Sequence, residues 1–438
     1  MADLKQLARQ IFLETLSAID VAATMRRKLW RDGLLLRCGD EIVVNLRTFN
    51  RICVIAIGKA AHGMVEGLVP VIPSNLTFDG VVSAPTQTAR VLSGLRYFVG
   101  GHPIPNRESW QAAEAILAAL KSCNEKTLVF FLLSGGGSAL VELPLDSNQT
   151  LEHLQQLYSA LVTCGAPIAE IGTVRRHLSA VKGGRLTAAA GAATKITLAV
   201  SDVPAKQEAA LASGPTLPDP TTVADVRQVL TRYGLQDQLP LTVRQWIDNG
   251  KMIETPKAGD PVFANAHFSL LLGMDDLFHP AHHAAEAKGC VTCCDNTTDD
   301  WPVEKASTFL LAQLEELRVA HRGRRVALIA DGEVSSPVIG NGIGGRNSAF
   351  VLACVERIAG RRLAVLSAGT DGIDGNSPAA GAVADGETLQ RARSMGMDPA
   401  DAFRRSDAYN FFDRMEDAVI TGPTGNNLRD LRILIAEP

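Results

Sequence analysis

Residues Leu132–Leu140 read LLSGGGSAL, and this stretch closes an apolar run that begins at Leu128. Its centre is a run of serines and glycines: Ser134, Gly135, Gly136, Gly137 and Ser138. An apolar strand followed by glycines is typical of a strand-to-helix turn, where backbone N–H groups and a helix N-terminus can bind an anion. A tight turn without a ligand would use glycine as well, so both interpretations stay open on local grounds.

Two further strand ends in the first half also carry polar residues. Arg51–Ile57 is a short β-branched run that ends in Gly58 and Lys59, and Ile196–Val200 leads to Asp202. Ligands of open α/β sheets bind at the carboxyl edge of the strands, so Lys59 is a candidate active-site cation and Asp202 a candidate base. The alternative for Lys59 is an ordinary solvated lysine. The G-x-x-x-x-G-K-[ST] spacing of a P-loop is absent.

The segment Val174–Arg185, VRRHLSAVKGGR, concentrates positive charge. Such a run is usually a solvated helix face. The paired glycines Gly183 and Gly184 favour a segment that faces an anion instead. The candidate binding residues are then Arg176, Lys182 and Arg185.

The second half repeats an alternation of β and α segments. Its expected strands are 325–330, 363–366, 418–421 and 431–436, with helices such as Asn347–Ile358 between some of them. This alternation predicts a mostly parallel sheet flanked by helices, like that of the first half. A segment rich in Pro, Asp and Thr precedes it, and we expect two α/β domains, 1–250 and 260–438.

The loop at residues 340–347, GNGIGGRN, contains the spacing G-x-G-x-x-G. A dinucleotide fingerprint needs a strand immediately before this spacing, and Pro337 interrupts that position. The sequence therefore disfavours a dinucleotide site. The same loop suits a nucleotide phosphate or a substrate anion, with Arg346 as a bidentate clamp.

The loop at residues 367–375, SAGTDGIDG, places two carboxylates after another expected strand. Asp371 and Asp374 could hold Mg²⁺, which prefers one or two carboxylates together with substrate phosphates. Glu333 is a third candidate ligand. The alternative is that the two aspartates are ordinary Asx-turn residues.

Composition narrows the class of protein. Of the 438 residues 46% are hydrophobic and 21% charged, which is typical of a globular protein, and the net charge of −4 argues against nucleic acid or an anionic membrane as a partner. No apolar run approaches the roughly 18–20 residues that cross a bilayer, and the first residues predict an amphipathic helix, so we expect a cytoplasmic protein. The cluster Cys290, Cys293 and Cys294 lacks a second ligand pair at zinc-site spacing, so free thiols are the better interpretation.

Eight segments taken together resemble one family, the class II glycerate kinases or glycerate 2-kinases, whose C-terminal part is the MOFRL domain. The segments are AIGKAA, GGHPIP, LLSGGGSALVELP, RRHLSAVKGGRL, SDVP with ASGPT, GGRN, SAGTDGIDG and TGPTG, in this order from about residue 53 to 425. The resemblance implies a Rossmann-like N-terminal domain, a smaller MOFRL-type C-terminal domain and an active site in the cleft between them.

The resemblance also implies a reaction: ATP-dependent phosphorylation of D-glycerate at its 2-hydroxyl, giving 2-phosphoglycerate, with Mg²⁺. Lys59 and Arg346 occupy the positions of active-site cations. The matching segments add further candidate binding residues: His102, Ser213, Gly344, Gly345, Asn347 and Thr424. A homodimer is compatible with the sequence.

Two points leave the substrate open. Members of this family also carry the label of an NAD(P)H-dependent hydroxypyruvate reductase, which is the alternative function. The sequence also departs from the family's pattern at Asn106, Lys206, Ser348 and Asn426. Because these changes alter acidic or polar groups near the matching segments, the acceptor is D-glycerate or a closely related 2-hydroxy acid.

Overall fold

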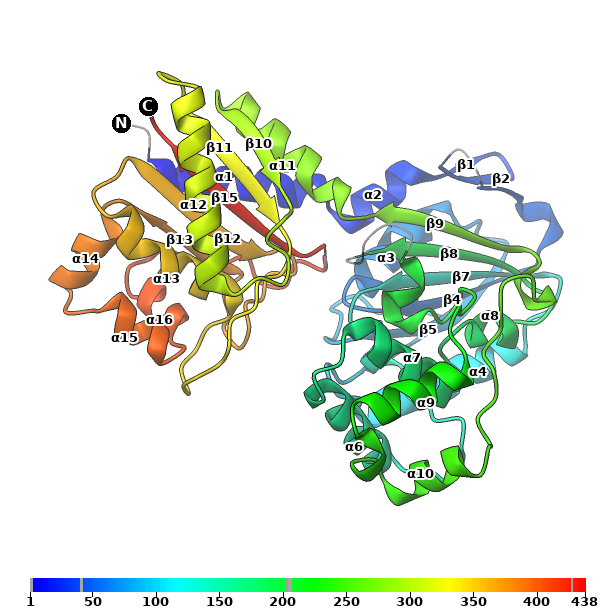
Figure 1. The fold of residues 1–438 in the computed structure, drawn as a ribbon. Helices are drawn as coiled ribbons and strands as arrows, with labels where there is room; N and C mark the ends of the chain where they lie inside the picture. Colours follow the sequence, from blue (N-terminus) through cyan, green and yellow to red (C-terminus); the bar gives the residue numbers. More distant parts are fainter. Residues whose placement is uncertain (1–2, 40–41, 202, 204–206, 427) are drawn as a thin grey trace. The chain divides into compact units, whose positions relative to one another are not determined.

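The computed structural model describes residues 3–39, 42–201, 203, 207–426 and 428–438. The chain divides into two compact units (Figure 1). The larger unit is Val21–Gly273, and the smaller unit combines Met1–Asp20 with Met274–Pro438. The division therefore falls some 20 residues after the boundary expected from composition, because the strand at 266–272 belongs to the sheet of the larger unit.

The sheet of the larger unit has six strands in the order β6-β5-β4-β7-β8-β9, and all its pairings are parallel. Their bounds are β4 Arg51–Ile57, β5 Thr77–Ala84, β6 Leu95–Val99, β7 Thr127–Ser134, β8 Thr194–Val200 and β9 Ala266–Leu272. Counted along this sheet the order is 3-2-1-4-5-6, which is that of the Rossmann fold. The order reverses between β4 and β7, so the predicted Rossmann-like fold is confirmed and its switch point lies between these two strands.

Helices cover both faces of this sheet, which explains why β7 is apolar along its whole length. All eight residues of β7 are buried, as expected for a strand of a parallel sheet covered on both sides. On one face Ile116 and Leu120 of α4 pack with Val129 and Phe131 in one apolar core. The helices close to the sheet are α2 Val21–Lys28, α3 Ala61–Leu68, α4 Arg107–Lys121, α5 Gly137–Leu140 and α8 Arg185–Ala189.

Four more helices form a separate layer in the larger unit (Figure 1). They are α6 Leu151–Thr163, α7 Ile168–Leu178, α9 Val223–Arg232 and α10 Leu241–Asp248. Leu161, Leu230 and Ile247 are among the buried residues that join them in an apolar core of their own. A small antiparallel sheet completes the unit, with β1 Leu29–Asp32, β2 Leu35–Cys38 and β3 Ile42–Asn45.

The sheet of the smaller unit is mixed. Its order is β10-β11-β15-β12-β13-β14, and only β10 and β11 pair in parallel. The bounds are β10 Val291–Asp295, β11 Val326–Asp331, β12 Leu363–Gly369, β13 Gly381–Asp385, β14 Ala418–Val419 and β15 Asp430–Ala436. The unit is an α/β domain as predicted, but the expectation of a mostly parallel sheet does not describe it.

The physical reason lies in the connections. A parallel neighbour needs a long crossover, usually through a helix, and β12 continues into β13 through a loop, residues 370–380, that contains no helix. The last strand, β15, enters between β11 and β12 and runs against both. As a result Asp430, the first residue of β15, lies at the same edge of the sheet as the carboxyl ends of β11 and β12.

The helices of the smaller unit again cover the sheet. They are α1 Leu4–Ala18, α11 Asp275–Ala287, α12 Val303–Ala320, α13 Arg346–Ile358, α14 Thr388–Ser394, α15 Pro399–Arg404 and α16 Ala408–Asp413. The N-terminal helix α1 belongs here, because its buried residues Leu7 and Ile11 cover this sheet and its Lys5 pairs with Asp417. Across the described part of the chain, no helix has the length and apolar character needed to span a membrane.

Candidate functional site

The loops after β4 and β7 meet at the switch point of the larger unit. The backbone N–H of Lys59 donates to the carbonyl of Gly135 at 3.0 Å, and the N–H of Ala60 donates to Ser134 Oγ at 2.9 Å. Gly58 makes this approach feasible: its φ is +127°, and a Cβ there would lie 2.1 Å from Ser134 Oγ. The two glycine loops predicted from the sequence therefore form one structure.

Gly136 is the centre of this structure. Its φ of +81° is a left-handed conformation that favours glycine. A Cβ at this position would lie 3.2 Å from the His102 ring and 3.5 Å from Lys59 Cγ, so both side chains lie against the glycine loop. No acceptor among the described residues takes the N–H groups of Gly136 and Gly137. These groups and the Lys59 ammonium are suited to an anion.

The ASGPT segment, residues 212–216, contacts this loop from another part of the chain. Ser213 Oγ is 2.8 Å from Ser138 Oγ, and Ser213 has a φ of +62°. The structure thus brings together Lys59, His102, the 134–138 loop and Ser213, and we call this group the anion loop. Asp202, the candidate base, lies outside the described residues.

Three cations of the basic segment 174–185 have partners inside the protein. Arg176 is buried and its Nε lies 2.9 Å from Asp219 Oδ1, while Lys182 Nζ lies 2.7 Å from Glu142 Oε2. Arg185 donates to the carbonyl of Ile253 at 3.2 Å. Buried cations need internal partners, and the layer of helices α6, α7, α9 and α10 supplies that burial. The charges of Arg176 and Lys182 are therefore compensated inside the protein, by Asp219 and Glu142.

Glu142 anchors a buried network next to the anion loop. Its carboxylate accepts from Lys182, from the hydroxyl of Ser179 at 2.5 Å and from the hydroxyl of Tyr158. The Tyr158 hydroxyl also lies 3.0 Å from the carbonyl of Ser138. Burial lowers the pKa of Lys182 and raises that of Tyr158, so the tyrosine stays protonated at neutral pH.

Replacing Lys182 by Met is expected to destabilise the larger unit strongly. The substitution leaves Glu142 buried without its charged partner, and breaking a buried ion pair in this way costs about 3–5 kcal/mol. Thermal unfolding followed by circular dichroism measures the effect. The double variant Glu142→Gln/Lys182→Met should recover part of the loss, because it removes the orphaned charge; a single variant as stable as the wild type would contradict the assignment.

In the smaller unit Arg346 is the first residue of α13. Its Nε donates to Asp430 Oδ2 at 2.5 Å, and its terminal nitrogen lies 2.7 Å from Glu333 Oε1. Burial would lower the pKa of Arg346, but the charges of Asp430 and Glu333 raise it overall. The side chain remains 36% exposed, so a charged guanidinium is held by two carboxylates and is still accessible to an anion.

The loops around Arg346 form a scaffold for α13. Asp374 accepts from the N–H groups of Asn347 at 2.9 Å and Ser348 at 2.8 Å, which caps the helix. Asn347 Oδ1 accepts from Ser367 Oγ at 2.6 Å. The N–H of Gly344 donates to Asn376 at 2.8 Å. These residues position the start of the helix that carries Arg346.

The three predicted metal ligands take separate roles. Asp374 is buried and accepts hydrogen bonds from the first N–H groups of α13. Glu333 pairs with Arg346. Asp371 accepts from the N–H of Ile373 at 3.0 Å, as in an Asx turn. Thr424 donates to the carbonyl of Thr370 at 2.5 Å beside this turn. Within the described residues, no three or more His, Cys, Asp or Glu side chains converge as a metal site. The predicted trio is therefore not a common site.

The structure points instead to a residue that the sequence reasoning missed. Asp331 ends β11, is fully buried, and has no hydrogen-bond partner for either carboxylate oxygen among the described residues. Burial raises its pKa to about 6. Asp299 lies beside it, accepting from the N–H of Glu333 at 2.8 Å and pairing with Arg429. An orphaned buried carboxylate requires an explanation. The charges of Arg429 and Arg432 act on Asp331 and lower its pKa against the larger effect of burial, and the two unpartnered carboxylate oxygens are donors that a divalent cation can use.

The signal for Asp331 was available in the sequence as an aspartate that ends an apolar run, VALIAD. It was not recognised because the expected strand ended at Ala330.

Three of the residues that depart from the family's pattern also have structural partners: Asn106 caps α4, Ser348 donates to Asp374 at 2.6 Å, and Asn426 donates to the carbonyl of Ile19 at 2.7 Å. Lys206 lies outside the described residues.

A six-stranded parallel sheet in the order 3-2-1-4-5-6, flanked by helices, defines an α/β protein of the Rossmann type. Two family models match this chain, a domain of unknown function (DUF4147) at residues 7–248 and the MOFRL family at residues 326–430. The chain belongs to the glycerate 2-kinase family that contains the MOFRL domain.

The relatives with names are consistent with this assignment. The D-glycerate 2-kinase of Thermotoga maritima is 35% identical over 88% of this chain and 90% of its own. A relative from Agrobacterium vitis, provisionally named hydroxypyruvate reductase, is 34% identical over 90% of each chain. The crystal structure of glycerate kinase from Thermotoga maritima matches with a TM-score of 0.83 and 32% identity, covering 100% of both chains.

Proposed function

We propose that this protein is an ATP-dependent kinase that phosphorylates the 2-hydroxyl of D-glycerate and releases 2-phosphoglycerate. The observation that carries the proposal is the anion loop at the switch point of a Rossmann sheet: it combines Lys59 with the N–H groups of Gly136 and Gly137, which have no acceptor among the described residues. Ligands of this fold bind at that point. The named kinase relatives, matched over most of the chain, support the same reaction.

The groups of the anion loop suit phosphoryl transfer. This chemistry asks the protein mainly to position the reactants and to stabilise negative charge on phosphate oxygens. In the proposed mechanism Lys59 and the glycine N–H groups bind phosphate oxygens, while Ser138 and Ser213 orient them by hydrogen bonding. Arg346 stabilises the charge of the transferred group through its planar fork of donors. Asp202 remains the predicted base for the hydroxyl proton.

Mg²⁺ belongs to this proposal through Asp331 and Asp299. These carboxylates would hold the ion, which when bound neutralises charge on the nucleotide phosphates. The unpartnered oxygens of Asp331 support the assignment. The carboxylates Asp371 and Asp374 retain their structural roles in this scheme.

Product analysis tests the function directly. Purified protein is incubated with ATP, Mg²⁺ and D-glycerate, and ³¹P NMR distinguishes 2-phosphoglycerate from 3-phosphoglycerate. L-glycerate serves as the control substrate. We expect 2-phosphoglycerate only with the D isomer; absence of phosphorylation of D-glycerate and of related 2-hydroxy acids would contradict the proposal.

The reductase alternative has weaker support. The G-x-G-x-x-G spacing lies in the long connection between β11 and α13, and the described residues immediately before it form no strand. The structural context of a dinucleotide fingerprint is therefore missing. Oxidation of NADH with hydroxypyruvate in the same preparation would favour the alternative.

Replacing Asp331 by Asn is expected to weaken divalent-cation binding by about 10- to 100-fold, the loss typical even for groups that only support a metal ligand. Binding of Mn²⁺ in the presence of ATP, measured by electron paramagnetic resonance, reports the affinity without catalysis. Asp300→Asn is the matched control, because Asp300 is exposed in the same loop as Asp299. Equal Mn²⁺ affinity in the wild type and the Asp331 variant would exclude Asp331 as a ligand.

Asp331→Asn should also change how the melting temperature depends on pH in metal-free buffer. The raised pKa means that the folded protein binds a proton at Asp331 up to about pH 6, whereas the unfolded chain releases it near pH 3.8. Ionised Asp331 therefore destabilises the fold increasingly as the pH rises between these values. Asp331→Asn should raise the melting temperature at pH 7, and this gain should vanish below about pH 4.

A further inference from the structure

The carbonyl of Ser138 in the anion loop has no partner within its own helix. Helix α5 ends at Leu140, and Val141 already has an extended backbone, with φ −136° and ψ 113°. The N–H of Glu142, which would donate to Ser138 in a longer helix, donates instead to the carbonyl of Ser109 at 3.3 Å. A carbonyl left over at a helix end needs another donor.

That donor is the hydroxyl of Tyr158, which comes from α6. The hydroxyl oxygen lies 3.0 Å from the carbonyl oxygen of Ser138, and it also contacts Glu142 Oε2. The side chain of Tyr158 is 1% exposed, and burial raises its pKa, so the hydroxyl keeps its proton at neutral pH. Tyr158 therefore connects the anion loop to the buried carboxylate of Glu142.

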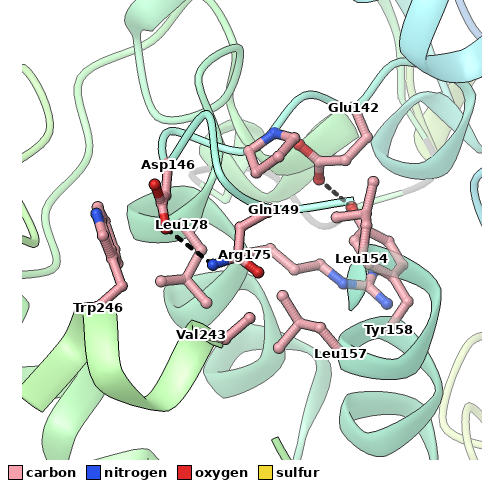
Figure 2. A pocket seen from close by; sticks show the side chains of 11 residues that line it. Glu142, Asp146, Gln149, Leu154, Leu157, Tyr158, Arg175, Leu178, Val243 and Trp246 are labelled. Atoms are coloured by element: carbon pink, nitrogen blue, oxygen red, sulfur yellow. Dashed lines mark hydrogen bonds between the residues drawn. The ribbon is translucent and has the colours of Figure 1, made fainter. Parts of the chain in front are cut away.

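Tyr158 is itself held from two sides. The guanidinium carbon of Arg175 lies 4.2 Å from its ring centroid, and the Glu142 carboxylate binds its hydroxyl (Figure 2). Arg175 is 9% exposed, and its Nε has no hydrogen-bond partner among the described residues; its contact with the ring is a cation–π interaction. Glu142 is fixed in turn by Lys182 and Ser179. The donor to the Ser138 carbonyl is thus a rigid one.

The groups that the proposed function assigns to phosphate lie in the same short turn. Gly136 and Gly137, whose N–H groups have no acceptor among the described residues, directly precede Ser138. The Ser138 side chain lies 2.8 Å from Ser213 Oγ. Because α5 is only four residues long, few backbone hydrogen bonds fix the direction of this turn. A hydrogen bond from outside the loop therefore contributes strongly to the orientation of the glycine N–H groups.

We propose that Tyr158 is a positioning residue of the anion loop. Its hydroxyl holds the Ser138 carbonyl so that the N–H groups of Gly136 and Gly137 converge on a phosphate oxygen. The role rests on the proposed kinase function, and Tyr158 acts through Ser138 without contacting the reactants. The ion pair of Glu142 and Lys182 is the fixed point from which the tyrosine acts.

Tyr158→Phe removes the hydroxyl and keeps the ring beside Arg175. We expect kcat/KM for ATP to fall by about tenfold or more, because a misplacement of about 1 Å in a positioned group costs up to about 100-fold in rate. Glu142 keeps Lys182 and Ser179 as partners, so its charge stays compensated and the larger unit folds. Steady-state kinetics and thermal unfolding measure the two effects.

Ser179→Ala is the matched control. Ser179 donates to the other oxygen of the same carboxylate, Glu142 Oε1, at 2.5 Å. The control therefore takes one hydroxyl donor from Glu142 and leaves the hydrogen bond between Tyr158 and Ser138 in place. We expect a similar small fall in melting temperature in both variants, but a kcat/KM near the wild-type value in Ser179→Ala.

A titration with inorganic phosphate reports on the loop without catalysis. In protein labelled with ¹⁵N-glycine, the amide cross-peaks of Gly136 and Gly137 should shift with phosphate in the wild type and in Ser179→Ala. In Tyr158→Phe we expect the same shift to require about tenfold more phosphate, which corresponds to about 1.4 kcal/mol.

Two results in these variants would overturn the proposal: equal phosphate affinity of the wild type and Tyr158→Phe, or a loss of kcat/KM that Ser179→Ala reproduces. Absence of any phosphate-dependent shift of Gly136 and Gly137 in the wild type would also overturn it. A wild-type protein that binds phosphate at these amides but phosphorylates no hydroxy acid would contradict the proposed function alone. The phosphate titration would still decide the role of Tyr158 in that case.

Discussion

Lys59→Met is expected to lower kcat for D-glycerate phosphorylation by about 100-fold or more, the loss typical when one charge-stabilising donor is removed. The ammonium of Lys59 extends from the loop that the Gly135 carbonyl and Ser134 hydroxyl fix in place. Methionine keeps the aliphatic stem beside Gly136 and removes only the charge. The anion loop should therefore keep its conformation while losing its cation.

Steady-state kinetics with ATP and D-glycerate measure this effect, and Lys126→Met is the control. Lys126 is exposed and directly precedes β7, at the amino end of the same strand whose carboxyl end carries the anion loop. The control removes the same charge from the opposite end of that strand, so its kcat should stay near the wild-type value. Near-normal turnover of Lys59→Met would remove Lys59 from the catalytic groups.

Arg346→Lys is expected to lower kcat by about 100-fold as well. The substitution keeps a positive charge between Asp430 and Glu333, which protects the fold. It removes the planar fork of donors that can bind a carboxylate and a phosphate at the same time, and a lysine ammonium does not replace that geometry. The expected loss is therefore in turnover, with little change in melting temperature.

The same kinetic assay with a thermal unfolding curve for each variant checks this prediction. Arg361→Lys is the control, because Arg361 pairs with Glu315 in the same unit at the far end of α13. A fall in melting temperature that parallels the fall in kcat would assign Arg346 a structural role. Arg346→Lys with full activity and full stability would exclude a need for the guanidinium.

The local sequence was sufficient to predict the main features of the larger unit. Apolar runs such as Leu128–Leu133 predict strands because a parallel sheet buries both faces of each strand. Glycines at strand ends predict tight turns because their backbone tolerates close approach, as at Gly58 and Gly136. Since parallel strands end at one edge, these local signals also predicted that Lys59 and the 134–138 loop would meet.

Charge partners were not predictable in this way. The sequence indicates that Arg175, Arg176 and Lys182 form a basic segment, but their partners lie far along the chain: Asp219 for Arg176 and Glu142 for Lys182. Whether a cation is neutralised inside the protein or faces a ligand depends on burial by helices that are distant in sequence. For the same reason the isolation of Arg175 is visible only in the folded protein.

The sequence by itself thus determined the α/β class, the Rossmann-like larger unit, the family and the anion loop, because each depends on patterns within short segments. Tertiary structure alone decided that β15 enters the smaller sheet between β11 and β12. It also decided that Asp331 and Arg175 are buried without hydrogen-bond partners among the described residues. The physical reason is that strand pairing, burial and charge compensation depend on contacts between residues that are tens of positions to about 110 positions apart, which no local pattern encodes.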